Sequence, residues 1–271
     1  MTQNRLSAAA IIVMLISMSV ALALGYENIR LQLSIIKTEI SKPPPPSVSY
    51  AGVQASLDRL SNEIRLSSPA DLGHAHVSVR QFVIRSQLSQ VKDPIVFVGD
   101  SITESAFLPA TICGHPVVSA GLGGATAGCY PEFAARAMPD LRASLVVISI
   151  GTNDAQIGAS KRESFTKSYN LLIDFLKPHA TTLVLVGIPP LEMTQDLARQ
   201  YFDKAASEEN DAIIKAIAKA KSVQFADVRS MMAGEKLTVD GVHLNPDGYR
   251  GWMTAVSGAV SKTLNCQSAS N

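Results

Sequence analysis

The 271-residue sequence predicts an α/β fold, a three-layer α/β/α sandwich around a central, mostly parallel sheet. Two observations support this prediction. Short apolar runs alternate with stretches of helical pattern from Pro94 to Leu264, and the runs are nearly continuous in Val, Ile and Leu. Such runs are typical of strands buried on both faces, as in a parallel sheet that helices cover. We therefore expect one domain over residues 51–271, with its core at 94–264.

Residues 1–26 predict a transmembrane helix or a signal peptide. No charged residue stands between Arg5 and Glu27, so the segment is long enough to cross a bilayer, which takes roughly 20 residues. The triplet at 21–23, Ala-Leu-Ala, resembles a cleavage site, but the apolar run exceeds the roughly 7–15 residues of a typical signal peptide, which favours an uncleaved anchor. Because Arg5 and the α-amino group precede the segment, the positive-inside rule places the following domain in the periplasm or outside the cell.

Residues 27–50 form an amphipathic stretch and a proline-rich linker. The stretch carries apolar residues on one helical face, which could pair two chains or lie on the membrane. The four prolines at 43–46 end any helix, because consecutive prolines lack amide donors and favour an extended form. Residues 70–92 cannot be assigned. There, His74 and His76 would share a face on a strand and could chelate a metal, but without a third ligand nearby a surface loop is favoured.

The elements of the predicted sandwich follow in order along the chain. Strands are expected at 94–100, 115–121, 144–154, 181–190 and 222–228, and helices near 127–138, 161–177, 196–220 and 246–264. This alternation predicts parallel strands joined by helices, whose carboxyl ends meet at one edge of the sheet.

Polar residues follow the predicted strand ends. Ser101 follows the first strand, a glycine loop starting at Gly121 follows the second, and Asn153 follows the third. Asp240 and His243 lie in the loop before the final helix. We expect these residues to meet at the carboxyl edge of the sheet, where α/β proteins place their sites.

The polar residues supply what acyl transfer requires. A serine hydroxyl becomes a useful nucleophile when an imidazole takes its proton, and the imidazole needs an acid to fix its tautomer. Asp240 precedes His243 by three residues, so one loop can present both, and the other four histidines lack such a partner. The glycine loop and the Asn153 amide are suitable donors to the oxyanion that forms on the attacked carbonyl.

Four short motifs carry a family resemblance. They are GDSI at 99–102, GLGGAT at 121–126, GTND at 151–154 and DGVH at 240–243. In this order they resemble the four blocks of the SGNH (GDSL-type) hydrolase superfamily, over roughly residues 94–264. The resemblance implies a flavodoxin-like fold and a serine esterase that needs no cofactor and no metal.

The resemblance also implies a role for each site residue. Ser101 would be the nucleophile and, through its own backbone amide, one oxyanion donor. Gly124 and Asn153 would be the other two donors, and Asp240 and His243 would complete the triad. The family often has a polar residue before the first glycine of this block and a Ser-Gly-Asp-like core. This chain has other residues at both places. The choice of Gly124 over Gly121 or Gly123 therefore stays open.

The neighbours of these residues have structural explanations. We expect Asp100 to hold the turn after the first strand, Glu104 to be an acid in a first helical turn, and Asp154 to support its neighbour or cap a helix. Tyr249 and Trp252 fall at helical spacing and are expected to pack rather than to contact substrate.

Composition and cysteines limit the partners. With 24 Lys and Arg against 23 Asp and Glu, the net charge of +1 predicts no attraction to nucleic acid. The three cysteines follow no metal-ligand spacing. In an exported domain Cys113 and Cys129 could form a disulfide, and three ordinary thiols are the alternative. The sequence does not indicate an oligomeric state.

An anchored, outward-facing member of this superfamily would act on O-acyl or O-acetyl groups of cell-surface or extracellular carbohydrate. A lipid esterase or thioesterase stays open, as does an O-acyltransferase, because a sugar hydroxyl can capture the same acyl-enzyme. A non-catalytic carbohydrate-binding or assembly protein is an alternative of another class, although such a protein would be expected to lose one of the five site residues. A nucleotide site is not expected, because Thr126 stands where GxGxxG needs its last glycine.

Overall fold

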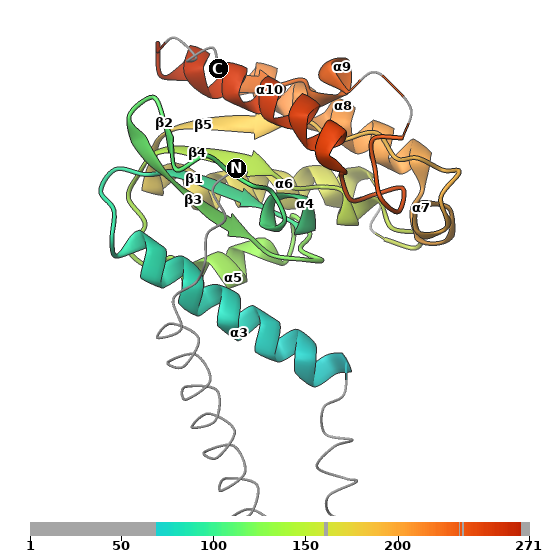
Figure 1. Cartoon of the computed structure of the whole chain (residues 1–271), viewed down its shortest axis with the longest axis horizontal. Helices are drawn as coiled ribbons and strands as arrows, with labels where there is room; N and C mark the ends of the chain where they lie inside the picture. Colours follow the sequence, from blue (N-terminus) through green and yellow to red (C-terminus); the bar gives the residue numbers. More distant parts are fainter. Residues whose placement is uncertain (1–68, 160–161, 233, 235, 267–271) are drawn as a thin grey trace, which may run out of the picture. The chain divides into compact units, whose positions relative to one another are not determined.

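The computed structural model describes residues 69–159, 162–232, 234 and 236–266 (Figure 1). The predicted membrane segment, the linker and residues 51–68 lie outside this part of the chain. None of the helices within the described ranges is both long enough and apolar enough to span a bilayer.

The sheet has six strands in the order β2-β3-β1-β4-β5-β6. The strands are β1 (Ile95–Gly99), β2 (Thr111–Ile112), β3 (His115–Gly121), β4 (Ala143–Ser149), β5 (Ala180–Val186) and β6 (Gln224–Ala226). All neighbouring pairs are parallel except the short β2, which runs antiparallel to β3. Without β2, the strands follow the 2-1-3-4-5 order of flavodoxin-like sheets. The predicted α/β fold with a mostly parallel sheet is thus confirmed.

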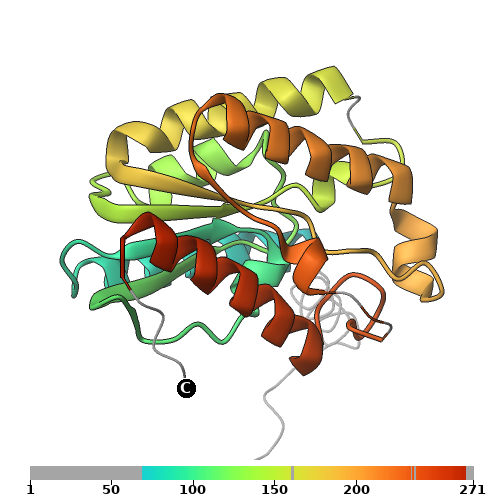
Figure 2. The ribbon, with the colours of Figure 1, turned by 90° about the horizontal axis from the view of Figure 1, so that it is seen from above.

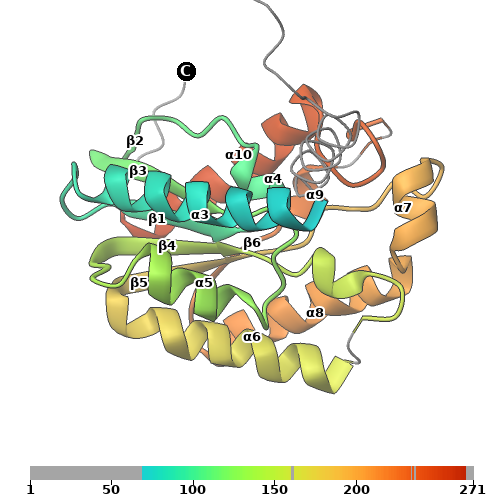
Figure 3. The same cartoon turned by 90° about the horizontal axis from the view of Figure 1, so that it is seen from below.

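Helices cover both faces of the sheet. They are α3 (Pro69–Leu88), α4 (Ser101–Glu104), α5 (Tyr130–Ala137), α6 (Arg162–Leu176), α7 (Asp196–Tyr201), α8 (Lys204–Ala220), α9 (Val228–Met231) and α10 (Pro246–Thr263), with 3-10 turns η1 (Asn153–Ala155) and η2 (Lys177–His179). On one face, α3, α5, α6 and α8 share a hydrophobic core with Val96 and Val98 of β1, and on the other α10 shares a core with Ile95 and Phe97. Figure 2 shows α10 in red on the opposite side of the sheet from α6 and α8, and Figure 3 shows α3 and α5 from below.

The alternation along β1 explains the near-continuous apolar pattern. Successive side chains of a strand point to opposite faces, so a strand between two helical layers buries all of them. Phe97 and Trp252 illustrate the second layer: both are fully buried, with ring centroids 6.3 Å apart. Burying one such side chain stabilises the fold by about 1.5–3 kcal/mol.

One helical prediction differs from the structure, and one unassigned segment is a helix. The helix expected at 196–220 is two helices, because Asp203 interrupts it and caps α8, accepting hydrogen bonds from the amides of Ala205 (2.8 Å) and Ala206 (3.2 Å). The segment that could not be assigned is the long helix α3. The surface loop favoured for His74 and His76 is therefore wrong, since both residues lie within this helix.

The cysteines pair differently from the pairing considered above. Cys113, next to β2, forms a disulfide with Cys266, just beyond α10, with their Cα atoms 5.9 Å apart. Cys129 is exposed at the start of α5 and belongs to no disulfide in the described part of the chain. The pairing of Cys113 with Cys129 is therefore wrong, because the fold brings the edge of the sheet to the end of α10.

Candidate active site

Ser101 lies where β1 turns into α4. The turn requires a glycine before it, because a Cβ at Gly99 would lie 2.0 Å from the Thr103 hydroxyl and 2.5 Å from the Ser149 carbonyl. Asp100 then caps α4, with its carboxylate accepting a hydrogen bond of 3.0 Å from the Ile102 amide. The role expected for Asp100 in holding this turn is confirmed, and it presents Ser101 as the first residue of α4.

Ser101, His243 and Asp240 form a continuous hydrogen-bonded relay. The Ser101 Oγ lies 2.9 Å from His243 Nε2, and His243 Nδ1 lies 2.6 Å from Asp240 Oδ2. The other carboxylate oxygen of Asp240 accepts hydrogen bonds from the backbone amides of His243 (2.8 Å) and Val242 (3.0 Å). The structure thus brings together the three residues that the sequence analysis selected, although Ser101 and His243 are 142 residues apart.

The electrostatics of Asp240 suit its position. Burial raises the pKa of this carboxyl, but the hydrogen bonds from His243 and Val242 outweigh burial and hold the pKa below its ordinary value. Asp240 is therefore ionised at neutral pH and accepts the Nδ1–H of His243. This contact sets the tautomer in which Nε2 is free to take a proton from Ser101.

The loop that carries Asp240 and His243 is held by Glu192, which no sequence motif marks. The Glu192 carboxylate accepts hydrogen bonds from the Leu237 amide and, at 2.5 Å, from the Thr238 hydroxyl. The backbone amide of Glu192 donates to the Gly241 carbonyl at 2.9 Å. Gly241 has φ +96°, and a Cβ there would lie 2.6 Å from the Ala198 Cβ, so glycine is required at this close approach.

Asn153 and Asp154 bind one side of the glycine loop. Asn153 is buried in η1 and donates through Nδ2 to the Ala125 carbonyl at 3.0 Å. The Asp154 carboxylate accepts from the Ala127 amide at 3.0 Å, and burial raises its pKa to about 6. An amide nitrogen carries two hydrogens, so Asn153 keeps one donor while the first fixes the loop.

The three glycines of the loop differ in what their backbones do. A Cβ at Gly121 would lie 2.3 Å from the Glu104 amide, so Gly121 packs tightly against α4. The Gly123 amide donates to Glu104 Oε2 at 2.6 Å. Gly124 is exposed with φ +76°, and we find no hydrogen-bond partner for its amide among the residues that the structure describes. Gly124 is therefore the glycine whose amide is available to an oxyanion.

Glu104 has more contacts than the sequence suggested. It is the last residue of the short α4, and besides Gly123 its carboxylate contacts His76 and Arg80 of α3. Sequence reasoning identified neither Arg80 nor a contact for His76. Tyr249 donates its hydroxyl to the Ile102 carbonyl at 2.8 Å and Trp252 is fully buried, which confirms the packing role expected for both.

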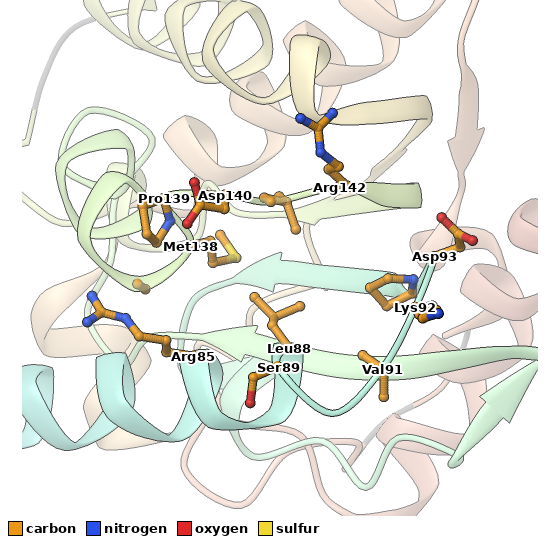
Figure 4. Close-up of a pocket in the computed structure, with 13 residues that line it drawn as sticks. Arg85, Leu88, Ser89, Val91, Lys92, Asp93, Met138, Pro139, Asp140 and Arg142 are labelled. Carbon is orange, nitrogen blue, oxygen red and sulfur yellow. The ribbon is translucent and has the colours of Figure 1, made fainter.

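A hollow of about 430 Å³ lies near the amino ends of the strands, opposite the carboxyl edge that carries the relay (Figure 4). Its lining includes Leu88 at the end of α3, Pro94 just before β1 and Arg142 just before β4. These residues precede the strands, whereas Ser101 follows β1, so the hollow does not belong to the relay. Within the described residues, no group of three His, Cys, Asp or Glu side chains is placed to hold a metal ion.

A serine, a histidine and an aspartate in hydrogen-bond contact at the carboxyl edge of a parallel sheet have the arrangement of a serine hydrolase. Residues 97–250, more than half of the chain, match the model of the GDSL-like lipase/acylhydrolase family. The chain belongs to this family, as its motifs suggested, and it is an ester-bond hydrolase.

Solved structures with the same fold include three of distant sequence. A GDSL-like lipase from Bacteroides thetaiotaomicron is 22% identical, with a TM-score of 0.55 over 68% of this chain and 98% of that one. A catalytic mutant of an acetylxylan esterase from Geobacillus stearothermophilus is 17% identical, with a TM-score of 0.51 over 67% and 98%. A carbohydrate acetylesterase from Sinorhizobium meliloti is 19% identical, with a TM-score of 0.53 over 64% and 100%. No curated protein matches the chain in sequence.

Proposed function

We propose that the protein is a serine esterase that removes O-acyl groups, acetyl above all, from cell-surface or extracellular carbohydrate. The observation that carries this proposal is the relay from Ser101 Oγ through His243 to Asp240, with hydrogen bonds of 2.9 and 2.6 Å. A hydroxyl in such a relay can transfer its proton as it attacks, which is the requirement for an acyl-serine intermediate.

The first half of the reaction forms the acyl-enzyme. Ser101 Oγ attacks the ester carbonyl carbon while its proton passes to His243 Nε2, and the carbonyl oxygen becomes an oxyanion. The amides of Ser101 and Gly124 and the Nδ2 of Asn153 donate hydrogen bonds to this oxyanion. Removing one such donor typically lowers kcat by about 10²–10³. The intermediate then collapses, the bond to the alcohol oxygen breaks, and His243 gives its proton to the departing alcohol.

The second half repeats these steps with water. His243 takes a proton from the water that attacks the acyl carbon, and the new tetrahedral intermediate breaks at the Ser101 Oγ, which recovers its proton from His243. The products are a carboxylic acid and the free enzyme. Asp240 remains ionised throughout and stabilises the imidazolium that forms twice in each cycle.

The substrate class rests on two lines of support. Two structures with this fold are an acetylxylan esterase and a carbohydrate acetylesterase, at 17% and 19% identity. The second line is the predicted outward-facing position, where acylated polysaccharides occur.

We also propose that residues 1–26 anchor the chain in the membrane and expose the catalytic domain to the periplasm or the cell exterior. The disulfide between Cys113 and Cys266 supports this location, because disulfides persist in oxidising compartments and are rare in the cytosol. Cell fractionation tests the proposal. The full-length chain should be found in membranes, and a shortened soluble form would indicate cleavage after the Ala-Leu-Ala triplet at 21–23 instead.

The experiment that tests the activity uses the full-length protein in mild detergent. A fluorophosphonate probe should add one label, detected by intact mass, which Ser101→Ala abolishes and the control Ser105→Ala, at an exposed serine four residues further along, retains. Hydrolysis should then be compared on acetylated xylan and on chromogenic esters of acetate, butyrate and octanoate. Preference for octanoate would indicate a lipid esterase, and acyl transfer to an added sugar would indicate a transferase. A folded protein that takes no label would refute the nucleophile.

A further inference from the structure

We propose that Glu104 is a positioning residue of this site, which with Arg80 and His76 of α3 holds the glycine loop so that the Gly124 amide points at the oxyanion. The proposal rests on the esterase function argued above and assigns to that reaction three residues that the family motifs do not assign. It also makes α3 a part of the active site.

The central contact joins α4 to the glycine loop. Glu104 Oε2 accepts a hydrogen bond of 2.6 Å from the Gly123 amide, the residue directly before Gly124. Hydrogen bonds to a carboxylate are shorter and roughly twice as strong as those between neutral groups. Because α4 spans only Ser101–Glu104, a single helical turn presents the nucleophile at its start and the anchor of the loop at its end.

Arg80 binds the same loop from α3. Its Nε donates to the Gly121 carbonyl at 3.0 Å and lies 3.5 Å from Glu104 Oε1, and its Nη2 donates to the Ser119 carbonyl at 3.2 Å. The side chains of Arg80 and Glu104 are only 15% and 19% exposed. Removing one partner of such a largely buried pair leaves the other charge poorly compensated, unlike the removal of a surface ion pair.

His76 completes the cluster at its exposed end. Its Nε2 lies 3.1 Å from Glu104 Oε1 and 3.2 Å from Oε2, and its side chain is 45% exposed. A Cβ built on Gly123 would lie 3.9 Å from both His76 Nε2 and the Ser101 Cβ. Gly123 therefore lies close to both the histidine of α3 and the nucleophile, which places the cluster next to the reacting serine.

The loop needs anchors because of its composition. Three of the four residues at 121–124 are glycines, and a glycine backbone is the most permissive of all, so Gly124 can leave φ +76° easily. Asn153 and Asp154 hold the loop after Gly124, through Ala125 and Ala127. Arg80 and Glu104 hold it before Gly124. The oxyanion donor thus lies between two anchors, one of which is this cluster.

Loss of the first anchor should lower turnover more than substrate binding. A misplacement of about 1 Å at a reacting centre can reduce the rate by about 10²-fold. We therefore expect Glu104→Ala to lower kcat on p-nitrophenyl acetate 10- to 100-fold and to change KM by less than about threefold, since the donor acts mainly in the transition state. In Glu104→Gln the side-chain carbonyl still accepts the Gly123 amide but leaves the charge of Arg80 without its partner, so this variant should recover only part of the kcat lost in Glu104→Ala.

The matched control is Glu132→Gln, which removes the charge of an exposed ion pair on α5, 2.6 Å from Arg136. It should change neither kcat nor KM. For all variants the full-length protein is compared by kcat and KM, by melting temperature and by active-site titration with a fluorophosphonate. The proposal is overturned if Glu104→Ala retains kcat within twofold of the wild type. It is equally overturned if Glu104→Ala and Glu104→Gln lower kcat to the same extent and the titration shows that the fraction of active enzyme has fallen by the same factor, because the loss would then be one of folding.

Amide hydrogen exchange separates this proposal from the proposed function. Glu104→Ala should raise the exchange rates of the Gly123 and Gly124 amides at least tenfold, and Glu104→Gln should raise them less. If the wild type hydrolyses no ester but exchange changes as stated, the esterase assignment fails while the anchoring of the loop holds. Unchanged exchange in Glu104→Ala would overturn the anchoring whatever the activity of the enzyme.

Discussion

Asp240→Asn should nearly abolish ester hydrolysis while leaving the protein folded. The asparagine carbonyl can replace Asp240 Oδ1 and accept the amides of His243 (2.8 Å) and Val242 (3.0 Å), so the loop keeps both backbone hydrogen bonds. Its NH₂ group then faces His243 Nδ1 in place of the carboxylate oxygen at 2.6 Å. Since an NH₂ group only donates, the proton of the ring moves to Nε2, which can no longer accept the proton of Ser101.

The magnitude follows from these contacts. A hydrogen bond to a charged group contributes about 1.5–3 kcal/mol, which alone corresponds to roughly 10- to 150-fold in rate. With the wrong tautomer added, the same exchange in serine proteases lowers kcat by about 10⁴, so we expect about 10³–10⁴ here. The free energy of unfolding should change by less than about 1 kcal/mol. Asp240→Ala should instead lower it by about 1–3 kcal/mol, because two amides lose their acceptor.

The assay combines kcat on p-nitrophenyl acetate with urea unfolding of the same preparations. The expected pattern is a large loss of activity in both variants and a loss of stability in the alanine variant alone. An Asn variant whose kcat stays within tenfold of the wild type would show that Asp240 does not set the tautomer of His243. A similar loss of stability in both variants would contradict the assignment of the two backbone hydrogen bonds.

Three further predictions concern the loop, a buried acid and the disulfide. Gly124→Ala should lower the free energy of unfolding by about 1–2 kcal/mol, because φ is +76° there, and should also lower kcat. Gly123→Ala should unfold like the wild type, because its Cβ would lie 3.4 Å from the nearest neighbour. Equal melting temperatures of the two variants would contradict this prediction. Burial raises the pKa of Asp100 from 3.8 to about 6, so the folded state binds more protons there than the unfolded state, and the free energy of unfolding falls by up to about 3 kcal/mol as pH rises through this range. Asp100→Asn should remove this difference between urea unfolding at pH 4 and at pH 7. The same pH dependence in the variant and the wild type would refute the prediction. Joint replacement of Cys113 and Cys266 by serine should lower stability by up to about 5 kcal/mol for a separation of 153 residues, and a reductant should lower the melting temperature of the wild type but not of this variant.

The sequence predicts the sheet well because its strands lie between two helical layers. β1 and β4 are buried along almost their whole length, which leaves uninterrupted apolar runs; both strands begin within one residue of the expected start, although β4 ends at Ser149 rather than at residue 154. β6 is less regular in its burial: it has three residues where seven were expected, and Gln224 and Phe225 are only half-buried at the sheet edge. The relay was also predictable, since its residues stand in short motifs at strand ends.

Helix α3 was not predictable from its pattern, because its apolar residues do not lie on one face. Ile84 is fully buried, whereas Val79 and Phe82 are 57% and 73% exposed. In α3 the apolar residues therefore form no single stripe that would mark the buried side of the helix. The disulfide escaped prediction for another reason: β2, which brings Cys113 to the end of α10, has two residues and no strand pattern.

The cluster around Glu104 shows where prediction from motifs ends. His76 is 28 residues from Glu104 in sequence, and Arg80 is 41 residues from Gly121, so no spacing connects them. Both lie before residues 97–250, the part of the chain that matches the family. The motifs contain the atoms that would react, because the same chemistry needs the same groups at the same strand ends. The residues that hold a glycine loop need only reach it, so they can come from an element that no motif includes. In this chain that element is α3, and the rigidity of the oxyanion donor is then a property of the whole domain rather than of the four motifs.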